Sequence, residues 1–477
     1  MIINLKKRDT FLKTTEKTES SIPVVESTDT LIAWFEEGNK PRDQWRIGTE
    51  HEKFGFRKKD LSPIAYEGND GIHAVLVSMA EKFGWTQSLE GGLPVALVKG
   101  PAAITLEPGG QLELSGAPLR TIHETQNEIN EHLHQLGQVC RDLDIVFLGI
   151  GAQPKWSFQK IPWMPKGRYR VMRDYLPTKG KLSLDMMTRT ATVQANVDYA
   201  DESDMVAKFR LSMAVQPVVT ALFANSPFLD GQPNGFRSYR AHIWHHTDPD
   251  RCGFLPFVFD PSFGFERYMD WAMDVPMLFY YRQGGYHAAG GVPFRRFFEG
   301  RLPALPGQKP TIDDWATHLS TLFPDVRLKR YLETRGADAG NSRTLCALPA
   351  FWKGLLYDSD ALEGAWERVA DWSMEDRWRL NAEVPKLGLK TAVPGGGTLR
   401  ELALALLDLA RDGLKTHNEC NANGCDESLF LKVLYQWAES GQSPADRLLE
   451  AFHGRWNGQV DPVFREEEFE SFYGECG

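Results

Sequence analysis

The stretch TATVQANVDY, residues 190–199, is the clearest β-strand pattern in the sequence. Side chains alternate between the two faces of a strand, so this stretch has one apolar face and one face of short polar groups. The apolar face consists of Ala191, Val193, Ala195, Val197 and Tyr199, and the polar face of Thr190, Thr192, Gln194, Asn196 and Asp198. We expect the apolar face to be buried in a core. The polar face is either solvated or lines a polar cleft, and the pattern leaves both open.

Around this strand, residues from about 45 to 300 are dominated by short alternating segments between Gly and Pro turns. Amphipathic helices are predicted at about 70–84, 120–142 and 203–223. A regular strand–helix rhythm is missing, which disfavours a doubly wound parallel sheet. The sequence therefore predicts the α+β class.

The ends of the chain differ from this middle region. Residues 1–24 are polar and lack periodicity, which predicts a flexible N-terminal arm. Residues 25–390 are expected to form the α+β domain that carries the functional site. Residues 391–477 are expected to form a helical part packed on the same domain, in which Thr398 and Glu401 predict a capping box.

Composition excludes several classes of protein. The 477 residues are 42% hydrophobic and 25% charged, and the formal net charge of −10 disfavours nucleic acid or anionic membrane as the main partner. No apolar run approaches the roughly 20 residues that span a bilayer, and MIINLKKRDT at the N-terminus is no secretory signal, so we expect a cytoplasmic protein. Six cysteines are too few for a disulfide scaffold. Cys420, Cys425 and His417 match no common zinc spacing, so a surface loop is favoured there.

Two glutamates are separated by one residue in RIGTEHEKF, residues 46–54. In a strand, Glu50 and Glu52 point to the same side, where two like charges repel each other. A solvated strand edge explains this pair adequately. Burial of both would require a cation.

A second acidic pair changes this balance. Residues 104–114, ITLEPGGQLEL, predict two strands joined by a Pro-Gly-Gly turn. Leu112 and Leu114 are expected to face the core, so that Glu113 points the other way. Together with Glu107 and the first pair, this gives an all-oxygen site of the kind that Mg²⁺ prefers.

A basic segment follows at residues 327–335, RLKRYLETR. Taken as one strand, it places Arg327, Lys329 and Arg335 on one face together with Glu333. Such a face in an acidic protein suggests an anionic ligand such as a triphosphate. Surface ion pairs explain the same pattern equally well.

Taken together, the long sequence blocks resemble those of the glutamate–cysteine ligases of plants and many proteobacteria, a family within the carboxylate–amine ligases. The resemblance spans most of the chain and is carried by blocks in a fixed order. They are IGTEHEKFGF at 47–56, LEPGGQLELSGAPL at 106–119, MPKGRYRVMRDYLP at 164–177, LDMMTRTATVQANVDY at 184–199, RAHIW at 240–244, DRCGFLPFVFDPSFGFERY at 250–268 and RLKRYLETRGAD at 327–338.

The resemblance implies an antiparallel sheet curved around the active site, as in glutamine synthetase, with helices outside. It implies that about two or three magnesium ions are held, as in other multi-metal sites. The implied ligands are Glu50, Glu52, Glu107, Glu113, Glu333 and Gln194. Lys329 and Arg335 are the implied catalytic residues and face the ATP phosphates, with Arg327 as a further ATP-binding residue.

The resemblance also implies substrates and a reaction. ATP would phosphorylate the γ-carboxylate of L-glutamate, and the amine of L-cysteine would then displace phosphate from γ-glutamyl phosphate. The implied substrate-binding residues are Arg240 for a carboxylate, and Trp244, Arg173, Thr190 and Tyr281 for the amino-acid pockets. A ligase for another amine, a non-catalytic binding protein and a metal-dependent hydrolase are the alternatives. A monomer or a homodimer is expected.

Two departures from the family pattern concern regulation and metals. The positions of the paired plant cysteines correspond here to Gln126, Ala289 and Ala304, and Cys346 alone matches. Thiol switching of the plant kind is therefore doubtful, and Cys346 is expected to be a buried thiol. His245 and His246 follow Trp244 in what we interpret as a strand, so they should point to opposite faces and share no metal.

Overall fold

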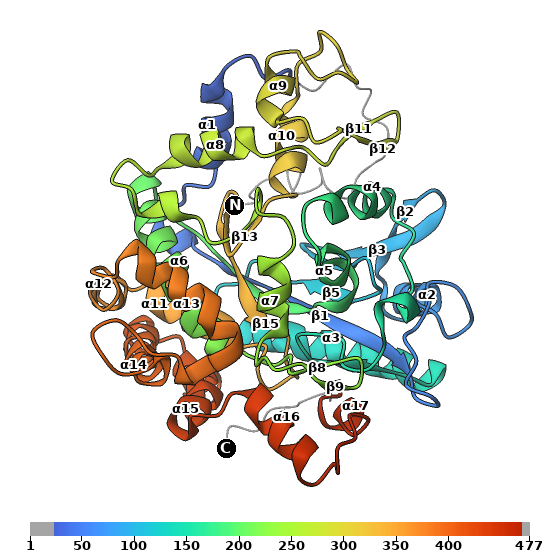
Figure 1. Ribbon diagram of the computed structural model, residues 1–477, viewed down its shortest axis with the longest axis vertical. Helices are drawn as coiled ribbons and strands as arrows, with labels where there is room; N and C mark the ends of the chain where they lie inside the picture. The colour runs from blue at the N-terminus through green and yellow to red at the C-terminus, as the bar shows by residue number, and fades with distance from the viewer. Residues whose placement is uncertain (1–22, 470–477) are drawn as a thin grey trace.

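The computed structural model describes residues 23–469 and has a sheet at its centre (Figure 1). The strands of the main sheet are β1 (Ile47–Arg57), β2 (Thr86–Glu90), β3 (Leu93–Lys99), β4 (Ala102–Leu106), β5 (Leu112–Ser115), β6 (Ile145–Leu148), β7 (Thr192–Val197), β14 (Val326–Leu328) and β15 (Leu332–Asp338). Their order is β14-β15-β7-β1-β5-β4-β3-β2, with β6 also paired to β1, and neighbouring strands run antiparallel. The fold is thus mixed α/β with a mainly antiparallel sheet, which confirms the predicted class at this level.

The strand from which the prediction started forms β7, in the middle of the sheet. Val193, Ala195 and Val197 are fully buried, as the alternation predicted. The strand begins at Thr192, because Thr190 forms a separate bridge to another segment. The apolar face of β7 belongs to one large core cluster together with side chains of the covering helices.

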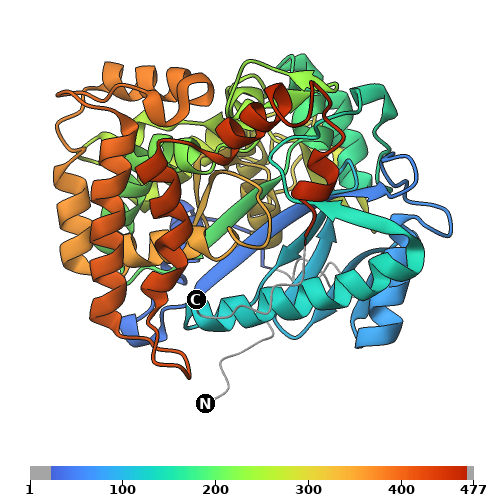
Figure 2. The same cartoon turned by 90° about the horizontal axis from the view of Figure 1, so that it is seen from below.

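Long helices cover the sheet. They are α2 (Ile72–Phe83), α3 (Ile122–Leu143), α6 (Glu202–Leu222) and α11 (Ala347–Leu356). Figure 2 shows α3 running along the underside of the strands. The helix starts at a capping box in which Thr121 and Glu124 bond each other's backbone N–H. The helices predicted at 70–84, 120–142 and 203–223 are therefore confirmed as α2, α3 and α6.

The C-terminal helices lie along one side and the lower end of the molecule in the view of Figure 1. They are α12 (Ser359–Glu367), α13 (Met374–Leu387), α14 (Leu399–His417), α15 (Lys432–Ser440), α16 (Pro444–His453) and α17 (Val463–Glu466). The predicted capping box is present at the start of α14, where Thr398 N–H donates to Glu401 at 2.8 Å. The division of the chain at residue 390 stays a prediction. Of the flexible arm predicted at 1–24, residues 1–22 lie outside the described part of the chain.

Shorter elements fill the remaining side. They are α1 (Thr28–Glu36), α4 (Gly167–Tyr175), α5 (Ser183–Arg189), α7 (Tyr239–His245), α8 (Phe265–Asp274), α9 (Phe294–Phe298) and α10 (Ile312–Leu319), with β8 (Phe228–Leu229), β9 (Gln232–Pro233), β10 (Cys252–Gly253), β11 (Phe279–Arg282), β12 (Gly285–Ala288) and β13 (Phe323–Pro324). Figure 1 shows α1, α8, α9 and α10 gathered at one end of the molecule and α4, α5 and α7 beside the sheet.

Two predicted strands have a different structure. The basic segment is a hairpin of β14 and β15, because the chain reverses where Lys329 N–H donates to Tyr331 O at 2.8 Å. His245 is the last residue of the helix α7, and His246 is its C-cap. The helix starts at Ser238, whose Oγ accepts from Ala241 N–H. The helical pitch, not strand alternation, decides where these histidines point.

Two cysteines can be compared with what the sequence predicted for them. Cys346 is 7% exposed, which confirms the expected burial. Cys420 is exposed in the segment after α14, as the loop interpretation predicted. No helix of the described residues is long and apolar enough to cross a membrane.

Candidate active site

The acidic side chains from β1 and β5 lie on one face of the sheet. In an antiparallel pair, residues directly opposite each other point to the same side. Glu52 on β1 is opposite Glu113 on β5, and Glu50 is opposite Gln194 on β7. Since Glu50 and Glu52 are two residues apart, they share a face. The four side chains form one polar row across three strands.

A fifth residue joins this row from the turn between β4 and β5. Glu107 N–H donates to Gln111 O at 2.9 Å, and Gly110 adopts a φ of +85° that favours glycine. The negative charge of Glu107 contributes to raised pKa values at both Glu52 and Glu113. The predicted Pro-Gly-Gly turn therefore brings this carboxylate beside the others. We call Glu50, Glu52, Glu107 and Glu113 the acidic face.

Burial makes the acidic face hard to ionise. It raises the pKa of Glu50 to about 7, with repulsion from Glu333 and Glu113 adding to the effect. Burial also raises the pKa of Glu52 well above its ordinary value, and Glu107 and Glu113 add to it. Burial likewise raises the pKa of Glu113, and the negative charge of Glu107 adds to this rise. A proton or a bound cation relieves such repulsion.

The donor set of the acidic face fits a hard divalent cation, because it consists of carboxylate oxygens. Three of the four are oriented by neighbours: Asn196 donates to Glu50 at 2.7 Å, Thr192 N–H to Glu52 at 3.0 Å and Thr105 to Glu113 at 2.5 Å. In the part of the chain between residues 23 and 469, no three His, Cys, Asp or Glu side chains are gathered tightly enough to form a coordination shell as they stand. The acidic face offers suitable ligands that are spread across the sheet.

Glu333 differs from these four carboxylates. It lies on β15 opposite Arg327 on β14, and both of its oxygens accept from that guanidinium, at 2.5 and 2.8 Å. Lys329 and Arg335 approach it at 3.4 and 3.3 Å. Although burial opposes ionisation, these three cations hold the pKa of Glu333 below its ordinary value. Its charge is already compensated, which sets it apart from the other predicted magnesium ligands.

The three predicted phosphate-facing cations have different environments. Arg327 donates to Glu333 and to the carbonyls of Ser320 and Leu322, so its Nε, Nη1 and Nη2 are all used within the protein. Arg335 reaches the acidic row, where Nη1 donates to Gln194 at 2.7 Å. Lys329 lies in the hairpin turn near the Tyr331 hydroxyl, at 3.4 Å. Arg335 and Lys329 remain able to meet a ligand, whereas Arg327 mainly supports Glu333.

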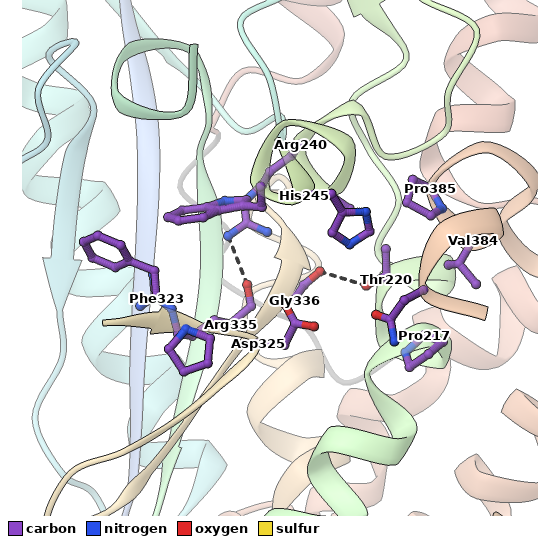
Figure 3. A pocket seen from close by; sticks show the side chains of 14 residues that line it. Pro217, Thr220, Arg240, His245, Phe323, Asp325, Arg335, Gly336, Val384 and Pro385 are labelled. Carbon is purple, nitrogen blue, oxygen red and sulfur yellow. Dashed lines mark hydrogen bonds between the residues drawn. The ribbon is translucent and has the colours of Figure 1, made fainter. Parts of the chain in front are cut away.

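Arg335 also lines a pocket (Figure 3). Two residues predicted to bind substrate line it from α7, namely Arg240 and Trp244. Arg240 Nη2 donates to Arg335 O at 3.0 Å, and both guanidinium groups lie within 6 Å of the Trp244 ring, at 5.8 and 5.7 Å. The carboxylate of Glu52 acts on Arg240 electrostatically, so the pocket borders the acidic face. The pocket contains a cavity of about 30 Å³ and is open to solvent.

The helix α7 is fixed by a buried carboxylate that the sequence did not reveal. Asp338 at the end of β15 accepts from Asn225 N–H at 2.8 Å and from the hydroxyls of Ser226 and Ser238 at 2.6 and 2.8 Å. Ser226 Oγ in turn accepts from Arg240 N–H at 3.1 Å. Asp338 is 1% exposed. The strand β15 therefore anchors the helix that presents Arg240 to the pocket.

Three predicted pocket residues do not line this pocket. Arg173 is exposed on α4 and lies over the Trp163 ring at 4.7 Å. The Thr190 hydroxyl donates to a carbonyl of α5 at 2.7 Å. Tyr281 packs against Tyr286 within its own hairpin, with ring centroids 5.0 Å apart. Each side chain is engaged by a local neighbour, which a single sequence does not reveal.

Two basic residues near the acidic face were missed. Lys166 donates to Leu106 O at 3.0 Å, and Arg168 lies over the Phe279 ring at 5.6 Å. Burial raises the pKa of the Glu107 carboxyl group, and the positive charges of Lys166 and Arg168 oppose this rise. The signal was present in the block MPKGRYRVMRDYLP, whose lysine and first arginine precede the arginine that we singled out.

Comparison with known proteins supports the resemblance drawn from the sequence. Residues 46–466 match the family described as glutamate-cysteine ligase family 2 (GCS2). The chain is 52% identical over 451 residues to the chloroplastic glutamate–cysteine ligase of Brassica juncea, covering 94% of this chain and 86% of that one. It is 51% identical over 451 residues to the Arabidopsis thaliana enzyme, covering 94% and 84%.

A solved structure shows the same fold. The glutamate–cysteine ligase of Francisella tularensis in complex with AMP superposes with a TM-score of 0.53, covering 90% of both chains. At 14% sequence identity, this likeness concerns the fold alone.

The relatives also correct one expectation and confirm another. The enzymes of Brassica juncea, Medicago truncatula and Arabidopsis thaliana are all named chloroplastic, so the expected cytoplasmic location is wrong. The predicted activity, in contrast, is confirmed by the family and by these names. The chain belongs to glutamate-cysteine ligase family 2, whose members join glutamate and cysteine in the first step of glutathione synthesis.

Proposed function

We propose that the acidic face binds magnesium and ATP, and that glutamate is activated between this face and the pocket of Arg240 and Trp244. The observation that carries the proposal is the gathering of four buried or half-buried carboxylates on one sheet face, all with raised pKa values. Buried acids that repel one another are costly for a fold, and a bound cation removes that cost. A ligase that handles a triphosphate needs such a cation.

Glu50, Glu52, Glu107 and Glu113 would hold about two or three Mg²⁺ ions, as is usual for sites that bridge phosphates. When bound, the ions neutralise charge on the β- and γ-phosphates. Gln194 supplies a neutral oxygen next to Glu50, to which it is paired across the strands. Glu333 has a different role in this proposal, because its ion pair with Arg327 orients Arg335 and Lys329.

Arg335 and Lys329 would stabilise the charge that develops on the transferred phosphoryl group. Arg335 is suited to this because it contacts the acidic row through Gln194 and the pocket through its backbone carbonyl. Lys166 and Arg168 approach Glu107 from α4 and would contact the phosphates from the opposite side.

In the first step, an oxygen of the glutamate γ-carboxylate attacks the γ-phosphorus of ATP, and ADP leaves. In the second step, the amine of cysteine attacks the carbonyl carbon of γ-glutamyl phosphate. Phosphate leaves, and the new amide has lost one proton to the medium. Arg240 would hold the α-carboxylate of glutamate throughout, while Trp244 forms a wall of the pocket.

The finer features of the fold and partners belong to the same proposal. We propose that the sheet curves around the nucleotide as in glutamine synthetase, and that the protein acts as a monomer or homodimer. Nucleic acid and membranes are not expected as partners, since the net charge is −10.

A direct assay tests the chemistry. The protein is incubated with ATP, MgCl₂, L-glutamate and a panel of amines including L-cysteine, while ADP is followed and products are identified by mass. We expect γ-glutamylcysteine as the main product and no turnover after chelation of the metal. A clear preference for another amine would make the protein a different carboxylate–amine ligase. ADP formation without glutamate would contradict the assignment.

A further inference from the structure

One acidic residue in the pocket has no assigned role. Asp325 lies between β13 and β14, facing the pocket together with Arg240 and Arg335 (Figure 3). Its position is set by its backbone carbonyl, which accepts from Arg335 N–H at 3.0 Å and from the Gln216 side chain at 3.3 Å. The side chain is therefore presented by a rigid backbone.

The carboxylate of Asp325 has no bonded partner. Within residues 23–469 no hydrogen bond or ion pair to its oxygens is found. Burial raises its pKa to about 6, although the positive charges of Arg240 and Arg335 oppose this shift. A carboxylate in this position would be stabilised by a cationic group that arrives with a ligand.

Two hydrogen-bond donors of the same pocket also have no partner. Arg240 Nε and Trp244 Nε1 are buried and form no hydrogen bond in the described part of the chain. Buried donors are usually satisfied, so such groups at a pocket wall indicate where a ligand acceptor belongs. Trp244 and Phe323, whose ring centroids are 5.6 Å apart, form an apolar wall beside them.

The combination of one free acceptor and two free donors fits a zwitterion. A carboxylate can accept from Arg240 and Trp244, while an ammonium can donate to Asp325. An amine without a carboxylate would leave the two donors unpaired. A simple dicarboxylate would bring a negative charge to Asp325. The pocket is therefore complementary to the head group of an α-amino acid.

We propose that Asp325 binds the α-ammonium group of glutamate while Arg240 binds its α-carboxylate. This inference rests on the proposed function. Of the two amino-acid substrates, glutamate fits because its amine takes no part in the reaction. The attacking amine of cysteine has to lose its proton, and a tightly paired carboxylate would oppose that loss. Asp325 therefore determines specificity for an amino acid over a plain dicarboxylic acid.

The test compares glutamate with glutarate, which lacks the α-amino group. ADP and product formation with saturating ATP, MgCl₂ and cysteine are measured for the wild type, Asp325→Asn and Asp325→Glu. Asp371→Asn serves as the matched control, because Asp371 is exposed and lies outside the pocket. Thermal unfolding of each variant shows whether the fold is retained.

We expect Asp325→Asn to raise the KM for glutamate about 10- to 100-fold, as for a lost charged hydrogen bond. Activity with glutarate should change little, so that discrimination between the two acids shrinks by a similar factor. Asp325→Glu should recover part of the discrimination, and Asp371→Asn should behave as wild type. An unchanged ratio in a folded Asp325→Asn variant would overturn the inference.

Two other results have distinct meanings. A fall in kcat at unchanged glutamate KM, with a changed pH profile, would make Asp325 a base for the attacking amine and would also overturn the inference. Absence of γ-glutamyl product with the wild type would instead contradict the proposed function itself.

Discussion

Glu52 on β1 and Glu113 on β5 are directly opposite each other on neighbouring antiparallel strands, where Glu113 is buried and Glu52 is half-buried. Like charges in that relationship destabilise a sheet. Their placement is understandable if a ligand supplies the missing positive charge.

Glu52→Gln should lower kcat at least about 100-fold, as for the loss of a preorganised electrostatic contact in an active site. The amide is nearly the same size, so the thermal unfolding temperature without metal should not fall. We expect the unfolding temperature to rise, because the substitution relieves the repulsion of Glu52 by Glu107 and Glu113. Steady-state kinetics and thermal melts measure both effects, with the exposed Glu131→Gln as a control. Near-normal turnover would remove Glu52 from the metal site.

The stability of the metal-free protein should depend on pH through Glu50. The pKa of Glu50 is about 7 in the folded protein and 4.5 in the unfolded chain, so between these two pH values the folded protein holds a proton that the unfolded chain does not. Unfolding then releases the proton, and the free energy of unfolding falls as pH rises from about 4.5 to 7, by roughly 1–3 kcal/mol. Urea denaturation at pH 5 and pH 7.5 measures the fall.

Glu50→Gln is the control for that experiment, because it removes the titrating group and leaves other groups such as Lys53 in place. Burial lowers the pKa of Lys53 to about 7, which makes the free energy of unfolding rise with pH. The quantity to compare is therefore the difference in pH dependence between wild type and variant. MgCl₂ should restore stability at pH 7.5 in the wild type. Equal pH slopes in the two proteins would contradict the prediction.

Arg327 and Arg335 should respond differently to the same substitution. Arg327→Met leaves the fully buried Glu333 without its bidentate partner and should cost about 3–5 kcal/mol of stability. Arg335→Met should change stability much less and should lower kcat about 100-fold or more. Denaturant unfolding and steady-state rates separate the two roles. A stable but inactive Arg327→Met protein would show that Arg327 contacts the nucleotide after all.

Arg240→Ala should raise the KM for glutamate about 10- to 100-fold, because a bidentate partner of a carboxylate is lost. The KM for cysteine should stay close to its original value. Arg240→Lys keeps the charge but loses the planar fork, so it should recover only part of the affinity. If cysteine use weakened while the glutamate dependence stayed the same, Arg240 would belong to the other amino-acid pocket.

Asp338→Asn should destabilise the protein by about 2–4 kcal/mol, since three donors converge on a side chain that would then have one acceptor. It should also raise the KM for glutamate, because α7 loses its anchor. Ser238→Ala removes one of the three hydrogen bonds and should have a smaller effect on both quantities. Urea titrations and glutamate saturation curves provide the comparison. An unaffected KM would show that α7 is held by its other contacts.

Much of the sheet could be predicted because period-two alternation is a local property. It identified β7, and it placed Glu50 and Glu52 on one face and Glu113 opposite the core leucines. The Pro-Gly-Gly turn marked the hairpin of β4 and β5 through its backbone requirement. The long helices were also visible, since their apolar spacing and caps extend over many residues.

The failures involve information that the local pattern does not contain. The turn at Lys329–Tyr331 has no Gly, Pro or Asn, so the basic segment was interpreted as one strand. The interpretation still placed Arg327 and Glu333 on one face, because residues paired across a hairpin also share a side. The assignment of Arg173 and Tyr281 to the amino-acid pockets stays a prediction, and in the structure they contact the rings of Trp163 and Tyr286.

The strand β15 carries Arg335, which we propose faces the nucleotide, and, three residues later, Asp338, which anchors α7 with Arg240. If occupation of one region shifted this strand, the shift would also reach the other region. We expect ATP and glutamate to bind synergistically, each lowering the dissociation constant of its companion by the same factor, as thermodynamic reciprocity requires.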